Sequence, residues 1–371
     1  MSDEASPEVK VSNELECQGC GAILKFKPGT HHLSCEYCGA ENEIFNPDDQ
    51  VVTIEETSLE EYLKEGLKKE EKIDIVTVRC DGCGGSFTFE PNLSSDFCPF
   101  CSSPKVIKGG TTASVYKPGY LLPFDISRKQ ALSSYQHWLK SLWFAPGDLK
   151  HYANNNDRFN GMYIPFWTYD CHTRTQYSGA SGHDYQVQRQ VNVIENGKSV
   201  TRTRYVTKTR WRHASGEVQN IFDDILVVAS SAVSQPKMNK IKAWDLDNLV
   251  PYDDKYLSGF RTETYTVNIE DGYENAKTKM HREIVFSVKQ DIGGDRQRID
   301  HLNTQYSGAS FKQILVPIWL SAYRYKGKVY QFIINGRTGA VAGDRPYSTK
   351  KIVLAILGGL LLILFISLFV K

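Results

Sequence analysis

The sequence has 371 residues, which is enough for two or three domains with a substantial core. Its 20 Tyr, 17 Phe and 6 Trp exclude a chain that is disordered throughout. Its 44 Lys and Arg against 43 Asp and Glu exclude a global electrostatic attraction to nucleic acid or anionic lipid, so any such attraction has to come from a local patch.

Eight of the nine cysteines form four C-x-x-C pairs near the start of the chain, and only Cys171 stands apart. The pairs fall in two sets with the same spacing, C-x2-C-x14-C-x2-C, which indicates an internal repeat. The first ten residues are polar and lack the apolar stretch of a secretory signal, so we expect a reducing compartment and metal-bound cysteines. The predicted ligands are Cys17, Cys20, Cys35 and Cys38 in the first set and Cys80, Cys83, Cys98 and Cys101 in the second.

Each set predicts a small zinc β-ribbon, over 1–45 and over 77–104. A glycine after three of the pairs (Gly21, Gly39, Gly84) frees the backbone for a tight turn, whereas Ser102 follows the fourth. Hairpins are expected around 23–26 and 86–89. Four thiolates close a tetrahedral shell, so we expect two structural Zn²⁺ ions and no catalytic zinc. A rubredoxin-like iron site is the alternative, suggested by Cys98-Pro-Phe-Cys101.

The segment 46–76 between the ribbons reads as an acidic helical linker. Ser58-Leu-Glu-Glu61 predicts a capped helix that runs to about Lys72 and carries an apolar stripe of Leu59, Tyr62, Leu63 and Leu67. Packing or spacing is the expected role. The acidic composition of this linker disfavours binding of the ribbons to nucleic acid.

The segment 105–346 predicts a β-rich α+β domain. Ser127 and Gln130 indicate a capped helix that ends at Ala145-Pro146-Gly147, and a second helix is expected over 274–290. Strands are expected over 161–169, 186–194, 199–212, 221–229, 314–325 and 328–335, with a hairpin turn at Asn196-Gly197. Pro165 and Pro317 predict edge positions or bulges in their strands.

The hairpin over 189–212 is rich in basic residues. Alternation places most of them on one strand face, where they could contact phosphates of nucleic acid or of lipid headgroups, although a solvated hairpin gives the same pattern. The candidate anion-binding residues are Arg202, Arg204, Lys208, Arg210 and Arg212. His183-Asp184 and Cys171-His172 lack an accompanying nucleophile or catalytic motif. An enzyme is therefore the minority interpretation, and no small-molecule substrate is indicated.

The segment 347–371 predicts a tail anchor. Residues 352–370 are apolar except for Ser367, and a helix of this length matches the roughly 30 Å hydrocarbon core of a bilayer. A buried core helix is the alternative. Arg345, Lys350 and Lys351 precede the span, and Lys371 alone follows it, so the positive-inside bias predicts a single-pass membrane protein with a cytosolic N-terminal region.

Several motifs together resemble a family of bacterial zinc-ribbon proteins of uncharacterised function. They are the paired C-x-x-C-G ribbons, Trp143-Phe-Ala-Pro146, Tyr163-Ile-Pro-Phe-Trp-Thr-Tyr-Asp170, Val316-Pro-Ile-Trp319 and Asn335-Gly-Arg-Thr-Gly339. Its members are often labelled by similarity to the zinc-binding part of primosomal helicase or to the ribbon of general transcription factor B. The resemblance implies a cytosol-facing protein of the bacterial inner membrane. Helicase activity is not expected, because the nucleotide-binding motifs are missing from this sequence.

Three hypotheses for function follow. The first is a binding or scaffold protein whose ribbons recruit a protein partner to the cytosolic membrane face. The second is a nucleic-acid-binding protein that uses the ribbons and the basic hairpin. The third is an unrecognised enzyme in the middle domain.

Overall fold

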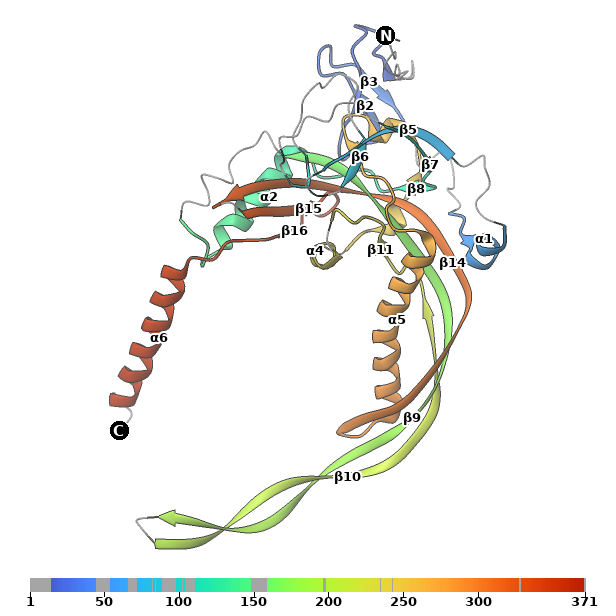
Figure 1. Cartoon of the computed structure of the whole chain (residues 1–371). Coiled ribbons are helices and arrows are strands. Elements are labelled where there is room, and N and C mark those ends of the chain that lie inside the picture. The colour runs from blue at the N-terminus through green and yellow to red at the C-terminus, as the bar shows by residue number, and fades with distance from the viewer. Residues whose placement is uncertain are drawn as a thin grey trace.

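The computed structural model describes residues 15–44, 54–65, 72–81, 83, 85–88, 98–101, 103, 111–147, 159–195, 198–233, 235–241, 243–326 and 328–369. Within these ranges the protein is a mixed α+β structure dominated by one long, curved sheet (Figure 1). The predicted turn at Asn196-Gly197, together with Gly84 and Ser102, lies outside the described residues.

Three long strands form the curved sheet: β9 (Asn160–Glu195), β10 (Lys198–Phe222) and β14 (Arg296–Tyr325). They continue the order β10-β9-β14 into β15 (Lys328–Asn335) and β16 (Val341–Gly343). Short strands add at the margins: β4 (Thr57–Ser58), β8 (Tyr120–Leu121), β11 (Val227–Val228), β12 (Val250–Pro251) and β13 (Arg261–Thr262). The predicted β14–β15 hairpin is confirmed.

The two strands predicted over 161–169 and 186–194 are one continuous strand, β9. Glycines in the middle of β9 permit close approach of the neighbouring strand β14. A Cβ atom on Gly179 would collide with the carbonyl oxygen of Arg298, beside the bulge between Ile299 and His301. Glycine at this position therefore lets the backbones pass, rather than ending the strand.

The expected edge positions for Pro165 and Pro317 are wrong, because both prolines lie inside the sheet. On one side of each proline, one partner strand ends and another begins. Pro165 falls between residues paired with β13 and residues paired with β11. Pro317 falls between residues paired with β8 and residues paired with β15. A gap between two short partner strands tolerates the missing N–H of proline.

The longest helix, α5 (Ile269–Ile292), packs on the concave face of the sheet (Figure 1) and confirms the predicted helix. Asn268 caps its start, and Gly293 ends it at φ 65°. The helix α2 (Arg128–Ser141) begins with the predicted Ser127–Gln130 capping box but ends before Ala145. Short helices complete the middle region: α4 (Gln235–Lys240), η4 (Leu246–Asn248) and η5 (Asp254–Leu257).

The N-terminal region contains two small sheets. The first holds β1 (Lys25–Phe26), β2 (His32–Ser34) and β3 (Glu41–Glu43), and the second has the order β6-β5-β7, with β5 (Lys72–Arg79), β6 (Ser86–Thr88) and β7 (Thr111–Tyr116). Between them, α1 (Leu59–Glu65) is described. The predicted extension of this helix to Lys72 is wrong, because Lys72 is the first residue of β5. Leu59 is buried, whereas Leu63 is exposed, and Leu67 lies outside the described residues.

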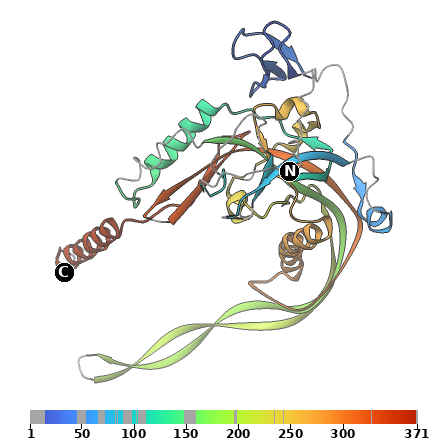
Figure 2. The same ribbon diagram turned by 45° about the horizontal axis from the view of Figure 1, so that its top comes forward.

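The last helix, α6 (Thr349–Phe369), is the predicted apolar C-terminal helix. None of its span Thr349–Ser367 is buried against the described protein. At ~1.5 Å per residue the helix is about 31 Å long, which is enough to cross a bilayer. In Figures 1 and 2, α6 and the free end of the β9–β10 hairpin leave the body on the same side.

Candidate functional site

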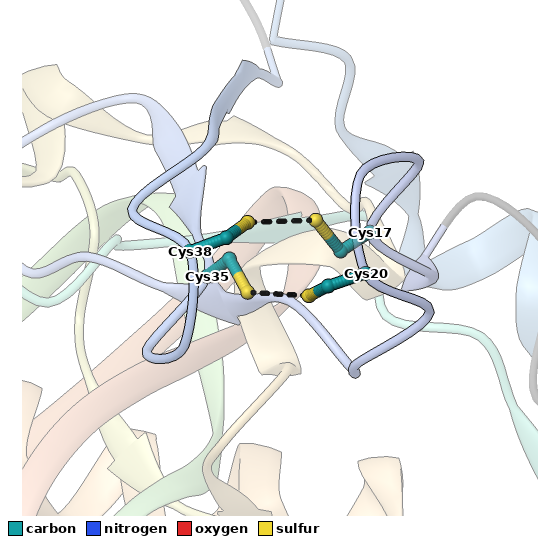
Figure 3. Close-up of side chains that lie close together, drawn as sticks. All are labelled: Cys17, Cys20, Cys35 and Cys38. Atoms are coloured by element: carbon teal, nitrogen blue, oxygen red, sulfur yellow. Dashed lines mark hydrogen bonds between the residues drawn. The ribbon is translucent and has the colours of Figure 1, made fainter.

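The structure brings the eight predicted cysteine ligands together as two separate clusters of four sulfurs. In the first cluster, the Cys17 and Cys38 sulfurs are 3.4 Å apart and the Cys20 and Cys35 sulfurs are 3.5 Å apart (Figure 3). Each contact joins one C-x-x-C pair to the other. All four sulfurs lie within 4.8 Å of one another.

The two turns of the first cluster have the same backbone geometry. The N–H of Gly21 donates to the Cys17 carbonyl, and the N–H of Gly39 donates to the Cys35 carbonyl. Both glycines have positive φ, 72° and 73°, which is the conformation that glycine adopts without strain. The predicted reason for glycine is therefore confirmed at Gly21 and Gly39. Backbone N–H groups of Cys38 and Tyr37 point at the Cys35 sulfur and lower the pKa of its thiol to about 6.

The second cluster repeats this arrangement. The Cys80 and Cys101 sulfurs are 3.7 Å apart, and the Cys83 and Cys98 sulfurs are 3.6 Å apart. The N–H of Cys80 donates to the Gly85 carbonyl in the same way that the N–H of Cys17 donates to the Ala22 carbonyl. Burial raises the pKa of the Cys83 thiol to about 11 and also raises that of Cys98. Metal binding at this cluster therefore has to displace protons from the thiols.

Both clusters have the size of a tetrahedral metal shell. A sulfur–metal distance of about 2.3 Å places tetrahedral sulfurs about 3.8 Å apart, whereas a disulfide requires about 2.05 Å. The sulfur separations of 3.4–3.7 Å match the first value and exclude disulfides. Within the described part of the chain, neither cluster includes a carboxylate or imidazole as a fifth donor. The clusters can therefore each bind one metal ion in a closed shell.

The two clusters rest on one short segment of the body, residues 256–263. From the first ribbon, the Phe26 ring packs edge-on against Tyr256 with ring centroids 5.1 Å apart, and the Phe26 N–H donates to the Ser258 carbonyl. From the second, Phe87 forms a β-bridge with Glu263, and Thr88 accepts a hydrogen bond from the Thr262 N–H. The sequence offers no signal for this docking, because the contacts join residues far apart in the chain.

The five candidate anion-binding residues all lie on β10 and are all exposed. Because they are at even-numbered positions, their side chains share one face of the strand. Among the described residues, no acidic side chain pairs with Arg204, Lys208 or Arg212. The Arg210 guanidinium lies 5.4 Å from the centre of the Tyr185 ring. The structure adds Arg189, which pairs directly with Arg204 from the opposite strand.

A charge cluster around the buried Lys312 was missed by sequence reasoning. The Lys312 ammonium is 2.9 Å from Glu56 and 2.7 Å from Asp224, and Asp170 is 3.7 Å away. Burial and the neighbouring Glu56 raise the pKa of Asp170 to about 7. Glu56, Asp170 and Asp223 are close enough to hold a metal ion, but the lysine already supplies the positive charge. The cluster therefore joins β4 to the curved sheet and is structural.

The remaining candidates have structural surroundings. Cys171 is buried, with its sulfur 3.9 Å from that of Met280, as a small packing residue would be. Asp184 accepts from Thr209 and pairs with Arg296 at 3.1 Å. His183 is exposed, with one ring nitrogen 3.3 Å from the Ser181 hydroxyl. The Ser181 hydroxyl itself donates to the Gly293 carbonyl at 3.2 Å, so its proton is directed to the backbone and not to the His183 ring.

The chain is similar to the uncharacterised protein YdjG of Bacillus subtilis strain 168, with 24% identity over 340 residues that cover 91% of each chain. No family model matches the chain, and no solved structure matches it. The matched length is 91% of the chain, so the similarity extends well beyond the cysteine motifs.

Proposed function

We propose that this protein is held in a membrane by α6, carries a structural zinc ion in each ribbon, and recruits a protein partner to the cytosolic face of that membrane. The observation that carries the proposal is the combination of two closed four-sulfur clusters with an apolar helix that no described part of the protein covers. A closed shell supports a fold rather than a reaction, and an uncovered apolar helix needs a bilayer.

Zinc is the metal that we propose for both clusters. It binds four thiolates tetrahedrally and has no redox chemistry that would endanger the thiolates in the cytosol. A rubredoxin-like iron site would use the same four sulfurs, and elemental analysis distinguishes the two metals. A zinc ion in each shell would stabilise turns that contribute few buried side chains of their own.

The junction between the body and α6 supports the membrane anchor. The Lys351 ammonium donates to the carbonyls of Trp143 and Ala145, at 3.2 and 2.8 Å, and the Ser348 N–H donates to the Phe144 carbonyl. The Trp143 side chain next to this junction is 79% exposed. An exposed tryptophan at the start of an apolar helix suits the headgroup region of a bilayer. Arg345 before α6 and Lys350 and Lys351 in its first turn then favour a cytosolic body.

The first ribbon offers the surface that we propose for the protein partner. Tyr37 lies between two cysteine ligands on a tight turn, and its side chain is 84% exposed. Ile23, near the other turn, is 43% exposed. Tyrosine held on a rigid turn loses little conformational entropy on binding and is enriched at energetically important interface positions.

Chemical cross-linking in intact membranes tests this proposal. The full chain should yield a defined cross-linked partner, and Tyr37→Ala should lose it while keeping its metal content. Tyr205→Ala is the matched control, because Tyr205 is also exposed but lies on the β9–β10 hairpin. Equal cross-linking of the wild type, Tyr37→Ala and a Cys17→Ser variant whose first ribbon lacks its ion would show that this ribbon does not recruit the partner.

A nucleic-acid-binding function is the second candidate, favoured by the row of basic residues on β10. It predicts filter binding that weakens steeply with salt and is reduced by Arg202→Ala and Arg204→Ala. The absence of binding near physiological salt would remove this candidate.

A further inference from the structure

The β9–β10 hairpin continues beyond the body as a two-stranded arm, which we define as residues 183–194 and 199–210. The pairing of β14 with β9 ends at Arg296 and Gly182. Beyond that point β9 pairs only with β10. The arm projects away from the rest of the protein (Figures 1 and 2), so no second layer covers either of its faces.

The register sorts the side chains of the arm into two different faces. One face, here called the basic face, carries the pairs His183–Arg210, Tyr185–Lys208, Val187–Val206, Arg189–Arg204, Val191–Arg202 and Val193–Val200. The other face carries Asp184–Thr209, Gln186–Thr207, Gln188–Tyr205, Gln190–Thr203, Asn192–Thr201 and Ile194–Ser199. Within 183–194 and 199–210 the five basic residues are therefore on one face and the acidic residue Asp184 is on the other, and the next pair, Glu195–Lys198, continues the register of the basic face with one residue of each sign.

Three arginines meet at the centre of the basic face. Arg189 and Arg204 are directly opposite each other, and Arg202 is the next residue of β10 on the same face. Directly opposed side chains have Cβ atoms about 5 Å apart, and like charges in this position destabilise a sheet. An anionic surface against this face would remove the repulsion.

The remaining residues of the basic face favour a lipid surface over nucleic acid. Valines alternate with the charges, and at the described end of the arm the basic face carries Val193 and Val200, which are 40% and 41% exposed. Unspecific nucleic-acid sites instead offer free aromatic rings for base stacking. The aromatic ring of the basic face, Tyr185, has the Arg210 guanidinium 5.4 Å from its centre, and the more exposed Tyr205 lies on the opposite face. Basic residues mixed with exposed aliphatic ones are typical of surfaces that bind the headgroup region of a bilayer.

The arm and α6 leave the body on the same side of the molecule (Figures 1 and 2). We propose that the basic face of the arm binds the anionic lipid headgroups of the membrane in which α6 is anchored, and so holds the body at a fixed orientation on that membrane. This proposal rests on the anchoring role proposed for α6.

Hydrogen exchange of the full chain in nanodiscs tests the proposal. Nanodiscs of neutral phosphatidylcholine are compared with nanodiscs that contain about a third of anionic phosphatidylglycerol. The amides of residues 183–210 should exchange more slowly in the anionic discs, and high salt should abolish the difference. Each basic residue near an anionic surface contributes about fivefold to binding, so substitution of Arg189, Arg202 and Arg204 by Gln should weaken docking about 100-fold.

Two control variants keep the experiment decisive. Substitution of the same three arginines by Lys keeps the charge and should keep the slow exchange. Gln186→Ala, Gln190→Ala and Thr203→Ala change the opposite face and should also leave it intact. Equal exchange of the arm in both lipids, or slow exchange that survives the three Gln substitutions, would overturn the proposal.

Two further measurements separate this proposal from nucleic-acid binding and from failure of the membrane anchor. A 40-nucleotide single strand added to the chain in neutral discs should leave the exchange of the arm unchanged. If the oligonucleotide slows amide exchange in the arm and anionic lipid does not, the lipid assignment is overturned and nucleic acid is favoured. Stable retention of the chain in neutral discs depends on α6 alone. If the chain is not retained in neutral discs, the result contradicts the membrane anchor proposed for α6 and not the lipid binding proposed for the arm.

Discussion

Substitution of a single ligand, Cys17→Ser, tests the metal centres most directly. It removes one of four sulfurs from the first cluster, so this ribbon should lose its ion and unfold, while the second ribbon keeps its own ion. The metal content should fall from two ions per chain to one. Cys80→Ser should give the same stoichiometry by emptying the other cluster.

The structure also predicts the effect of Cys17→Ser on the body. Unfolding of the first ribbon withdraws the Phe26 ring from Tyr256 and Phe260, whose centroids are 5.1 and 6.3 Å away. Loss of a buried phenylalanine from a core costs about 3–5 kcal/mol. For a folded unit of roughly 200 residues, each kcal/mol lowers the melting temperature by about 2–4 °C, so the body should melt about 6–20 °C lower.

Elemental mass spectrometry and calorimetry of the purified full chain provide the two measurements. Cys171→Ser is the matched control, because Cys171 is buried beside Met280 and away from both clusters. It should keep two ions. Retention of two ions by Cys17→Ser would show that Cys17 is not a ligand, and loss of both ions would show that the ribbons do not bind metal independently.

Three further predictions concern the anchor, the buried charges and the curved sheet. Deletion of residues 350–371 should release the protein from membranes, and continued pelleting with them would contradict the anchor. In the folded protein the pKa of Asp170 is raised from 3.8 to about 7, so the folded state keeps a proton that the unfolded state has released, and stability falls as pH rises through this window. Between about pH 5 and 7, chemical denaturation of the wild type should show an unfolding free energy that falls by about 1.4 kcal/mol per pH unit. The Asp170→Asn variant should lack this fall. The same change of unfolding free energy with pH in both proteins would refute the assignment. Gly179→Val should destabilise the protein by about 3 kcal/mol because its side chain meets the Arg298 carbonyl, whereas Gly147→Ala, which has open space around it, should be nearly neutral in the same denaturation experiment.

Local signals in the sequence predicted the parts of the molecule that depend on neighbouring residues. The spacing of the cysteines predicted two four-sulfur clusters, and the structure forms both. The Ser127–Gln130 capping box and the apolar run before Phe369 predicted α2 and α6. These features are read from residues a few positions apart, because a tight turn, a helix cap or an apolar span is complete within one short segment.

Long-range contacts account for the predictions that were wrong. Two strands were predicted over 161–169 and 186–194, yet β9 is continuous through Gly179, where β14 passes too closely for a side chain. Lys72 continues a helical pattern, but pairing with β7 places it in a strand. The prolines predict edges, but breaks between partner strands accommodate them inside the sheet.

The sequence by itself therefore determined the two four-cysteine clusters, the apolar C-terminal helix and the α+β class, because each depends on composition or short spacing. The tertiary structure alone decided that residues 256–263 support both ribbons, that Lys312 joins three carboxylates, and that Arg189 meets Arg204 on one face of a projecting arm. These arrangements arise from the register and curvature of long strands. A shift of one residue would send every side chain of the arm to its other face, and no short stretch of sequence encodes that choice.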